Sequence, residues 1–339
     1  MSEPLKCKIN LTKLKRNALK VKSLLNNGVK LCAVVKSDAY GHGIINISSA
    51  LYSICDYFAV SLAVEGLKLR LSGIDKPILL LSPATERTID NLIINDITLS
   101  VSTFKELILI VKRSKKLNRR VKVHIAINTG MNRLGFNKNE VQKAVDFIKK
   151  FSLIELDGAY SHFGCVEDKE YTKKCFDNFS KAVKPVKKYN KKALLHISSS
   201  GGLLLNENYQ LSMVRVGLLF YGYTPIITKK IRVEPIMEVY AKNLILRSGV
   251  RNNRVGYGKE VCNADEISIL RLGYADGFFR NNVLPFESNL CMDLSAVNRN
   301  ESDYVLIMDD AQKYSKKLNT IPYEILVSVS KRAEREYFY

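Results

Sequence analysis

Short β-rich runs alternate with longer amphipathic stretches over the first two thirds of the chain, and this alternation most constrains the fold. Helical spacing of apolar residues marks the stretches between the runs, as in NEVQKAVDFIKKF (139–151). Eight strands alternating with helices over roughly 220 residues are typical of an α/β protein with a (β/α)8 TIM barrel, and a doubly wound sheet is the main alternative. The eight runs are LCAVV (31–35), YFAVS (57–61), PILLLS (77–82), ITLSVS (97–102), VKVHIAIN (121–128), ELDGAYSHF (155–163), LLHISSS (194–200) and VRVGLLFYG (214–222).

The pattern of apolar and polar residues changes after Tyr223. TPIITKKIRVEP (224–235) has the composition of a linker, and the runs beyond it alternate apolar and polar residues between turn signals, as strands do. We therefore expect a barrel over residues 1–228 and a smaller, mostly β domain over residues 229–339. The runs that predict strands in the second domain are MEVYAKNLILRS (237–248), EISILRLGY (266–274), DYVLIM (303–308) and YEILVSVS (323–330), with a turn at GVRNNRVGYG (249–258).

The formal charge of +20 raises the question of nucleic-acid binding. Most of the excess lies in runs such as VKRSKKLNRRVK (111–122) and KAVKPVKKYNKK (181–192), which sit between apolar segments like solvated helix ends and lack interleaved aromatic residues. We expect no nucleic-acid partner. No apolar run is long enough to span a membrane and the N-terminal segment does not resemble a signal peptide, so we expect a cytoplasmic protein.

The distribution of cysteine and histidine argues against a disulfide framework and a metal centre. The seven cysteines are scattered and never stand at CxxC spacing, and the four histidines include no HExxH arrangement. We therefore expect no bound metal.

The TIM barrel places its active site at the C-terminal ends of the strands, with phosphate often held after the seventh and eighth. This rule selects Lys36 after the first run, His162 in the sixth, Ser200 at the end of the seventh, and Arg215 and Gly217 in the eighth. A lysine in such a place can form a Schiff base if water is limited, although a lone lysine is more often a solvated charge. Ser200 is followed by two glycines, which suits either a phosphate site or a plain helix cap.

The segment around Lys36, AVVKSDAYGHG (33–43), resembles the cofactor-lysine segment of the alanine racemase family, and further blocks follow in the family's order. These blocks are KINLTKLKRN (8–17), TGMNRLGF (129–136), SHF (161–163), MVRVGLLFYG (213–222), VGYGK (255–259), GYADG (273–277) and CMD (291–293). Together they span almost the whole chain. The resemblance implies a homodimeric enzyme that uses pyridoxal 5'-phosphate.

The resemblance also implies the roles of individual residues. Lys36 would form the Schiff base and act as a base on one face of the substrate's α-carbon, and Tyr257, supplied by the second subunit, would act on the other face. Arg215 would contact the pyridine nitrogen, and His162 would hydrogen-bond Arg215 and fix its angle. Arg133 would lie near the cofactor's phenolic oxygen and the substrate carboxylate.

Further residues are implied on the phosphate side and at the entryway. The phosphate-side candidates are Tyr40, Ser200, Gly217, Leu218 and Tyr337. The backbone of Met292 would bind the substrate carboxylate, and Tyr274 and Asp293 would line the entryway, although all three are also plausible packing residues. The second domain would thus complete the active site of the partner subunit.

The sequence departs from the family pattern at several positions. Ala126 replaces a lysine that is often carbamylated and buttresses the arginine corresponding to Arg133, and Asn128 replaces a common aspartate. Either a bound anion or an uncharged hydrogen bond could hold Arg133 instead. Lys331 stands where many members have a tyrosine that lines the substrate pocket, and the segment 278–290 is shorter than usual. These changes make serine a credible second substrate.

The sequence therefore predicts an amino-acid racemase, with alanine as the first substrate and serine or a broader range as the alternative. A barrel-fold decarboxylase would place an acidic residue on the pyridine nitrogen, and Arg215 argues against it. A non-catalytic carrier of pyridoxal phosphate would need neither Tyr257 nor a second domain. A degenerate, inactive homologue is the last alternative.

Overall fold

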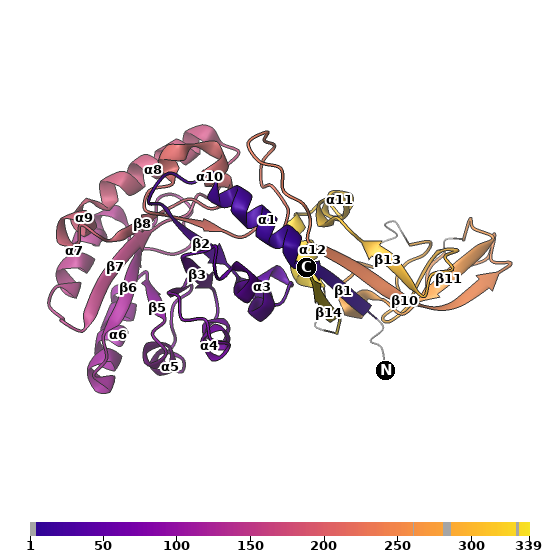
Figure 1. Cartoon of the computed structure of the whole chain (residues 1–339), viewed down its shortest axis with the longest axis horizontal. Coiled ribbons are helices and arrows are strands. Elements are labelled where there is room, and N and C mark those ends of the chain that lie inside the picture. The colour runs from indigo at the N-terminus through magenta and orange to yellow at the C-terminus, as the bar shows by residue number, and fades with distance from the viewer. Residues whose placement is uncertain (1–4, 260, 281–285, 330–331) are drawn as a thin grey trace. The chain divides into compact units, whose positions relative to one another are not determined.

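The computed structural model describes residues 5–259, 261–280, 286–329 and 332–339 (Figure 1). The chain divides into two compact units that are discontinuous in sequence. One, the barrel unit, contains Lys15–Ala39 and Ile44–Val233, and the other, the sheet unit, contains Met1–Leu14, Tyr40–Gly43 and Glu234–Tyr339. The expected division at residues 228 and 229, with its separate functional roles, stays a prediction.

Eight parallel strands form the core of the barrel unit, one from each run that the sequence predicts. Their sheet order is β8-β7-β6-β5-β4-β3-β2-β9. Hydrogen bonds from Ser212 N to Leu195 O (2.9 Å) and from Arg215 N to Ser198 O (3.1 Å) join the two ends of this order, so the sheet closes like a barrel. The strands are β2 (Lys30–Val34), β3 (Tyr57–Val60), β4 (Ile78–Leu80), β5 (Thr98–Val101), β6 (Val121–Ala126), β7 (Ile154–Tyr160), β8 (Leu194–His196) and β9 (Met213–Val216).

Almost every residue of these strands is buried, as expected where helices cover a parallel sheet and the strands read as continuous apolar runs. Figure 1 shows the helices flanking the strands. Two of the longest begin at side-chain caps, where Thr103 accepts from Glu106 N at the start of α6 and Asp168 accepts from Tyr171 N at the start of α8. The helices are α1 (Leu11–Lys22), α2 (Lys36–Tyr40), α3 (Ile44–Leu51), α4 (Ala63–Leu71), α5 (Ile89–Ile94), α6 (Phe104–Leu117), α7 (Lys138–Ile148), α8 (Lys169–Ala182), α9 (Lys184–Tyr189) and α10 (Ser200–Leu205).

The sheet unit is mostly β, as the sequence predicts. Its sheet has the order β12-β11-β10-β1-β14, with β13 also paired to β10. All pairs are antiparallel except β1 with β14. The strands are β1 (Leu5–Asn10), β10 (Met237–Ser248), β11 (Glu266–Leu270), β12 (Ser295–Asn298), β13 (Tyr304–Met308) and β14 (Glu334–Phe338).

Two details of this unit differ from the sequence expectations. The N-terminal segment is a strand of this sheet, since β1 pairs with β10 and β14. The run YEILVSVS was wrongly predicted as a strand, because Pro322–Ser328 forms the helix α12. Proline at the first turn favours a helix start, and the adjacent residues Ile325 and Leu326 are both buried, whereas in a strand they would face opposite sides. A second helix, α11, spans Ala311–Lys317.

Helices that could cross a membrane are absent from the part of the chain that the structure describes.

Candidate active site

Lys36 lies two residues after Val34, the last residue of the buried strand β2. The ladder extends one residue past β2, where Val35 N donates to Ala59 O (2.9 Å). The lysine is half-buried. Burial lowers the pKa of Lys36, the positive charge of Arg133 lowers it further, and Glu65 opposes the shift. A lysine amine with a lowered pKa loses its proton more readily, which a Schiff-base lysine requires.

A left-handed turn follows Lys36 and makes up the rest of α2, which is therefore not a regular right-handed helix. Residues 37–40 all have φ between 53° and 54°, although none is glycine. The left-handed conformation costs roughly 1–2 kcal/mol for each such residue, so neighbouring groups must hold the turn. Ala39 N donates to Val35 O (2.9 Å), Ile44 N donates to Asp38 Oδ1 (2.9 Å), and Ser37 N donates to Glu65 Oε1 (2.5 Å).

Residues 40–43 belong to the sheet unit and are tied to it at several points. Tyr40 is buried and its ring lies 5.7 Å from that of Tyr323, and burial raises its pKa. The Tyr337 hydroxyl donates to the carbonyl of His42 (3.1 Å). At Gly41, with φ of 81°, a Cβ atom would lie 2.4 Å from the carbonyl oxygen of Leu326, so only glycine fits. Tyr40 and Tyr337, both expected on the phosphate side, therefore help to anchor this segment.

Arg215 lies on β9 and its guanidinium is buried among neutral acceptors. Its Nη1 lies 2.6 Å from His196 Nδ1, and its Nη2 donates to Ser161 O (2.7 Å) and approaches His162 Nδ1 (3.2 Å). Its Cζ also lies 5.3 Å from the ring centroid of Tyr160. The expected contact between His162 and Arg215 is present. Burial lowers the pKa of Arg215 to about 10, so the group stays positive at neutral pH.

Both histidines beside Arg215 are neutral at pH 7. Burial, and then the charge of Arg215, lower the pKa of His162 to about 3. The pKa of His196 is lowered by the same causes in the same order. Because a guanidinium can only donate hydrogen bonds, each histidine must accept through Nδ1 and carry its proton on Nε2.

A buried relay of side chains, which the sequence analysis missed, extends from Arg215 through the barrel. His196 Nε2 lies 2.9 Å from His124 Nδ1, and His124 Nε2 lies 3.1 Å from Asp157 Oδ2. With its proton on Nε2, His196 donates to His124, which in turn donates to the Asp157 carboxylate. The only signal in the sequence was a histidine within each of two barrel strands, where an apolar residue is usual.

Arg133 lies in the loop between β6 and α7 and is exposed. Asn128, which replaces the common aspartate, closes this loop: its Oδ1 accepts from Gly130 N and Asn132 N (both 3.1 Å), and its Nδ2 donates to Asn132 Oδ1 (2.9 Å). Ala126 is buried at the end of β6. Uncharged hydrogen bonds thus shape the loop that carries Arg133, and the charge of Arg133 acts on Lys36 and His162.

Ser200 begins α10 and is buried, as are the two glycines that follow it. A Cβ atom at Gly201 would lie 2.8 Å from Val166 Cγ2, so close packing alone explains that glycine. Gly217 and Leu218 follow β9 and are also buried. They open a tight turn in which Phe220 N donates to Gly217 O (2.9 Å).

The remaining expected residues lie in the sheet unit, and most of them are exposed. Tyr257, between Gly256 and Gly258, is 65% exposed, Met292 is 56% exposed, and Tyr274 is also exposed. Lys331 lies outside the described residues, as does part of the shortened segment 278–290.

Asp293 belongs to a cluster of ion pairs that the sequence analysis did not predict. Its Oδ1 lies 2.8 Å from Arg332 Nη2 and 3.2 Å from Arg271 Nη1. Arg332 Nε also lies 3.3 Å from Asp276 Oδ1. The hydrogen bond from Arg332 holds the pKa of Asp293 below its usual range. Asp293 is therefore a negative charge held in place by arginines.

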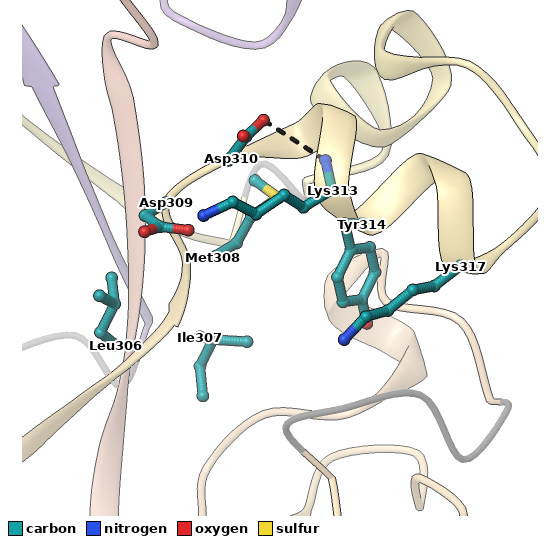
Figure 2. Close-up of a pocket in the computed structure, with 8 residues that line it drawn as sticks. All are labelled: Leu306, Ile307, Met308, Asp309, Asp310, Lys313, Tyr314 and Lys317. Atoms are coloured by element: carbon teal, nitrogen blue, oxygen red, sulfur yellow. Dashed lines mark hydrogen bonds between the residues drawn. The ribbon is translucent and has the colours of Figure 1, made fainter.

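A separate cavity of about 240 Å³ lies in the sheet unit between β13 and α11 (Figure 2). It contains none of the residues that the sequence selects. Asp310, on its wall, caps α11 by accepting from Gln312 N (2.8 Å) and Lys313 N (3.4 Å), so this carboxylate has a structural role. The lining residues are Leu306, Ile307, Met308, Asp309, Asp310, Lys313, Tyr314 and Lys317.

Comparison with known proteins points to a single family. The family model "Alanine racemase, N-terminal domain" matches residues 9–225, and "Alanine racemase, C-terminal domain" matches residues 236–337. The alanine racemase of Methanococcus maripaludis is 32% identical, with 100% of both chains covered. The solved alanine racemase of Clostridium difficile 630 is 30% identical and superposes with a TM-score of 0.93, covering 100% of this chain and 96% of that one. A complex of that enzyme with cycloserine gives a TM-score of 0.90 at the same identity, covering 99% and 96%.

Proposed function

Because this chain belongs to the alanine racemase family, we propose that it is a pyridoxal-phosphate-dependent racemase that interconverts L- and D-alanine. The observation that carries the proposal is the pairing, in one barrel, of a half-buried lysine with a lowered pKa and a buried arginine that donates hydrogen bonds to neutral acceptors. The family homologues are named as alanine racemases, and the substrate of this chain is the part that experiment must establish.

The residues present fit pyridoxal phosphate. Lys36 offers an amine that would hold the cofactor's aldehyde covalently, and Arg215 offers a protonated donor for the ring nitrogen. Ser200, Gly217 and Leu218 are the candidates for its phosphate. When bound, this cofactor supplies an electron sink that makes the proton on the substrate's α-carbon acidic.

Arg215 would keep the cofactor ring a weak electron sink. A carboxylate at the ring nitrogen would favour its full protonation, whereas a guanidinium donates a hydrogen bond and keeps its own proton. His162 and His196 orient that guanidinium and, being neutral, leave its charge intact. A weak sink favours prompt return of the proton to carbon, which suits racemisation and argues against a decarboxylase.

Racemisation needs one base on each face of the α-carbon, and Lys36 and Tyr257 are the proposed pair. One would remove the proton and the other would deliver a proton from the opposite face. Tyr257 is largely exposed in the single chain, in keeping with a group that works in the active site of a second copy. We accordingly propose a homodimer in which each sheet unit completes the other subunit's site.

The substrate carboxylate would be bound by Arg133 and by the backbone of Met292, with Tyr274 and Asp293 at the entryway. The loop at Asn128 gives Arg133 a defined backbone without a carbamylated lysine. Serine is the second candidate substrate, because Lys331 replaces a bulky ring in the family pattern.

Chiral analysis of the product tests the proposal. Purified full-length protein with added pyridoxal phosphate is incubated with L-alanine or L-serine, and the D-enantiomers are quantified. Faster formation of D-alanine supports an alanine racemase, and faster formation of D-serine moves the substrate to serine. If the cofactor binds but neither D-product forms, the racemase proposal fails and a carrier or an inactive homologue replaces it.

A further inference from the structure

Glu65 joins two segments at the barrel mouth that are separate in sequence. It is the third residue of α4 and is buried. Its Oε2 accepts from Ser61 N and Leu62 N (both 2.9 Å), and its Oε1 accepts from Ser37 N (2.5 Å). A single carboxylate thus binds the loop after β3 and the residue that directly follows Lys36.

Two other glutamates occupy the same position in their helices, and the comparison isolates what is special about Glu65. Glu106 in α6 accepts from Ser102 N (2.7 Å), and Glu140 in α7 accepts from Asn137 N (2.7 Å). Each of these caps the start of its own helix, as is common at this position. Of these three glutamates, Glu65 is the one that also accepts a hydrogen bond from the turn after Lys36.

The turn that Glu65 holds needs an external anchor. Its first residue, Ser37, has φ of 53° without being glycine, and three more left-handed residues follow. The bond from Ser37 N fixes the peptide next to Lys36, and hence the direction in which the lysine side chain leaves the backbone.

The charges that act on the Lys36 amine come from several elements of the barrel. Arg133 acts from the loop after β6, and Glu65 acts from α4. Arg133 and Lys36 both act on the neutral His162 at the end of β7. Glu65 is the carboxylate among these neighbours and favours the protonated amine.

We propose that Glu65 is a positioning residue that fixes the left-handed turn after Lys36 and so aims the lysine amine into the site. This inference rests on the proposed function, because it concerns how Lys36 captures the cofactor. It gives Glu65 a role beyond capping α4.

Covalent capture of pyridoxal phosphate by the full-length protein tests this role. Protein and cofactor are mixed over a pH series and quenched with borohydride at set times, and mass spectrometry measures the fraction of Lys36 that carries the reduced adduct. Each variant yields a limiting capture rate and a pH midpoint. The variants are Glu65→Gln, Glu65→Asp and, as the matched helix-cap control, Glu140→Gln, with circular dichroism to verify folding.

Glu65→Gln should lower the limiting rate about tenfold or more, because the amine is no longer held in line for attack. It should also move the midpoint to lower pH, because the carboxylate that favours the protonated amine is gone. Glu65→Asp keeps the charge but is too short to bridge both segments, so its rate should fall while its midpoint stays near that of the wild type. Glu140→Gln should match the wild type in both.

Wild-type rates and midpoints in both Glu65 variants would overturn the inference, as would equal losses in the Glu65 and Glu140 variants. The proposed function is tested separately by the wild type itself. If wild-type Lys36 captures no cofactor, the proposed function fails regardless of Glu65; if Lys36 captures it and the Glu65 variants behave normally, only this inference fails.

Discussion

Arg215 in the barrel unit and Tyr257 in the sheet unit differ in how much of the side chain is buried and in how many hydrogen bonds hold it. Arg215 is 4% exposed and is held by Ser161, His162 and His196, whereas Tyr257 is 65% exposed in its loop. Arg215 is therefore desolvated and held by hydrogen bonds within its own chain. Tyr257, Tyr274 and Met292 of the sheet unit are exposed.

This difference suggests how the proposed chemistry is divided. Cofactor binding needs desolvation and fixed donors, which a closed barrel provides within one chain. A second base must stand on the opposite face of the substrate, and an exposed loop of a second copy can provide it. Loss of a barrel residue should therefore impair cofactor binding, and loss of Tyr257 should impair only the proton transfer.

The largest expected effect lies on the barrel side. Lys36→Ala should remove covalent cofactor binding and reduce racemisation to the rate of free cofactor, because the amine and one base are lost together. Lys30→Ala, at the other end of β2, is the matched control and should keep normal activity. Absorbance of the bound cofactor and chiral analysis measure the two effects. Substantial covalent binding by Lys36→Ala would contradict the assignment.

The segment 40–43 sharpens the comparison because it follows the barrel lysine but packs in the sheet unit. Gly41 and Gly28 share a φ of 81°, but a Cβ atom would meet the carbonyl of Leu326 only at Gly41, and nothing lies within 4 Å at Gly28. Gly28→Ala should cost about 1 kcal/mol of unfolding free energy, and Gly41→Ala about 2 kcal/mol more. Urea unfolding of both variants measures the difference, and equal losses would show that the contact is unimportant.

Stability should depend on pH through the barrel histidines. Because the folded-state pKa of His162 is about 3, against 6.5 for an ordinary histidine, the unfolded chain binds more protons between these values. The contribution of each such histidine to the free energy of unfolding should be fully present above about pH 6.5. Below that pH the free energy of unfolding should fall by about 1.4 kcal/mol per pH unit for each such histidine. His162→Gln should reduce that slope in urea midpoints measured from pH 7 to pH 5. An unchanged slope would mean that His162 titrates normally in the fold.

The smallest effect concerns two tyrosine hydroxyls, one in each unit. Tyr337→Phe removes the bond to the carbonyl of His42 and should cost about 1 kcal/mol, because the carbonyl is left in a partly buried place. Tyr52→Phe removes an exposed bond to Asp75 in the barrel unit and should cost less than about 0.5 kcal/mol. Thermal unfolding of both variants shows which one loses more unfolding free energy. A larger loss in Tyr52→Phe would contradict the anchoring role of Tyr337.

The barrel could be predicted from the sequence because its strands are buried on both sides and read as compact apolar runs. The run YEILVSVS misled the prediction because the alternation in its last four letters, VSVS, can arise by chance. Burial of both Ile325 and Leu326 favours the helix instead. The N-terminal strand was not recognised because its pairing with β10 joins residues more than 220 positions apart.

The candidate site could be selected only in part. Strand ends and the family resemblance identified Lys36, His162 and Arg215, and the bond from Arg215 to His162 is present. His124 and His196 were not selected, because their contact depends on the register of strands that no local pattern encodes. Glu65 was not selected because a glutamate at the third position of a helix is common and has an ordinary capping role.

Isotope exchange by Tyr257→Phe tests the two-base account most directly. The variant, loaded with pyridoxal phosphate, is incubated in heavy water with L-alanine and, separately, with D-alanine, and early deuterium incorporation at the α-carbon is measured for each. The account predicts that racemisation falls by about 10²–10⁴-fold while one enantiomer still exchanges through Lys36 and the other does not. Racemisation at the wild-type rate, or equal exchange from both enantiomers, would contradict it.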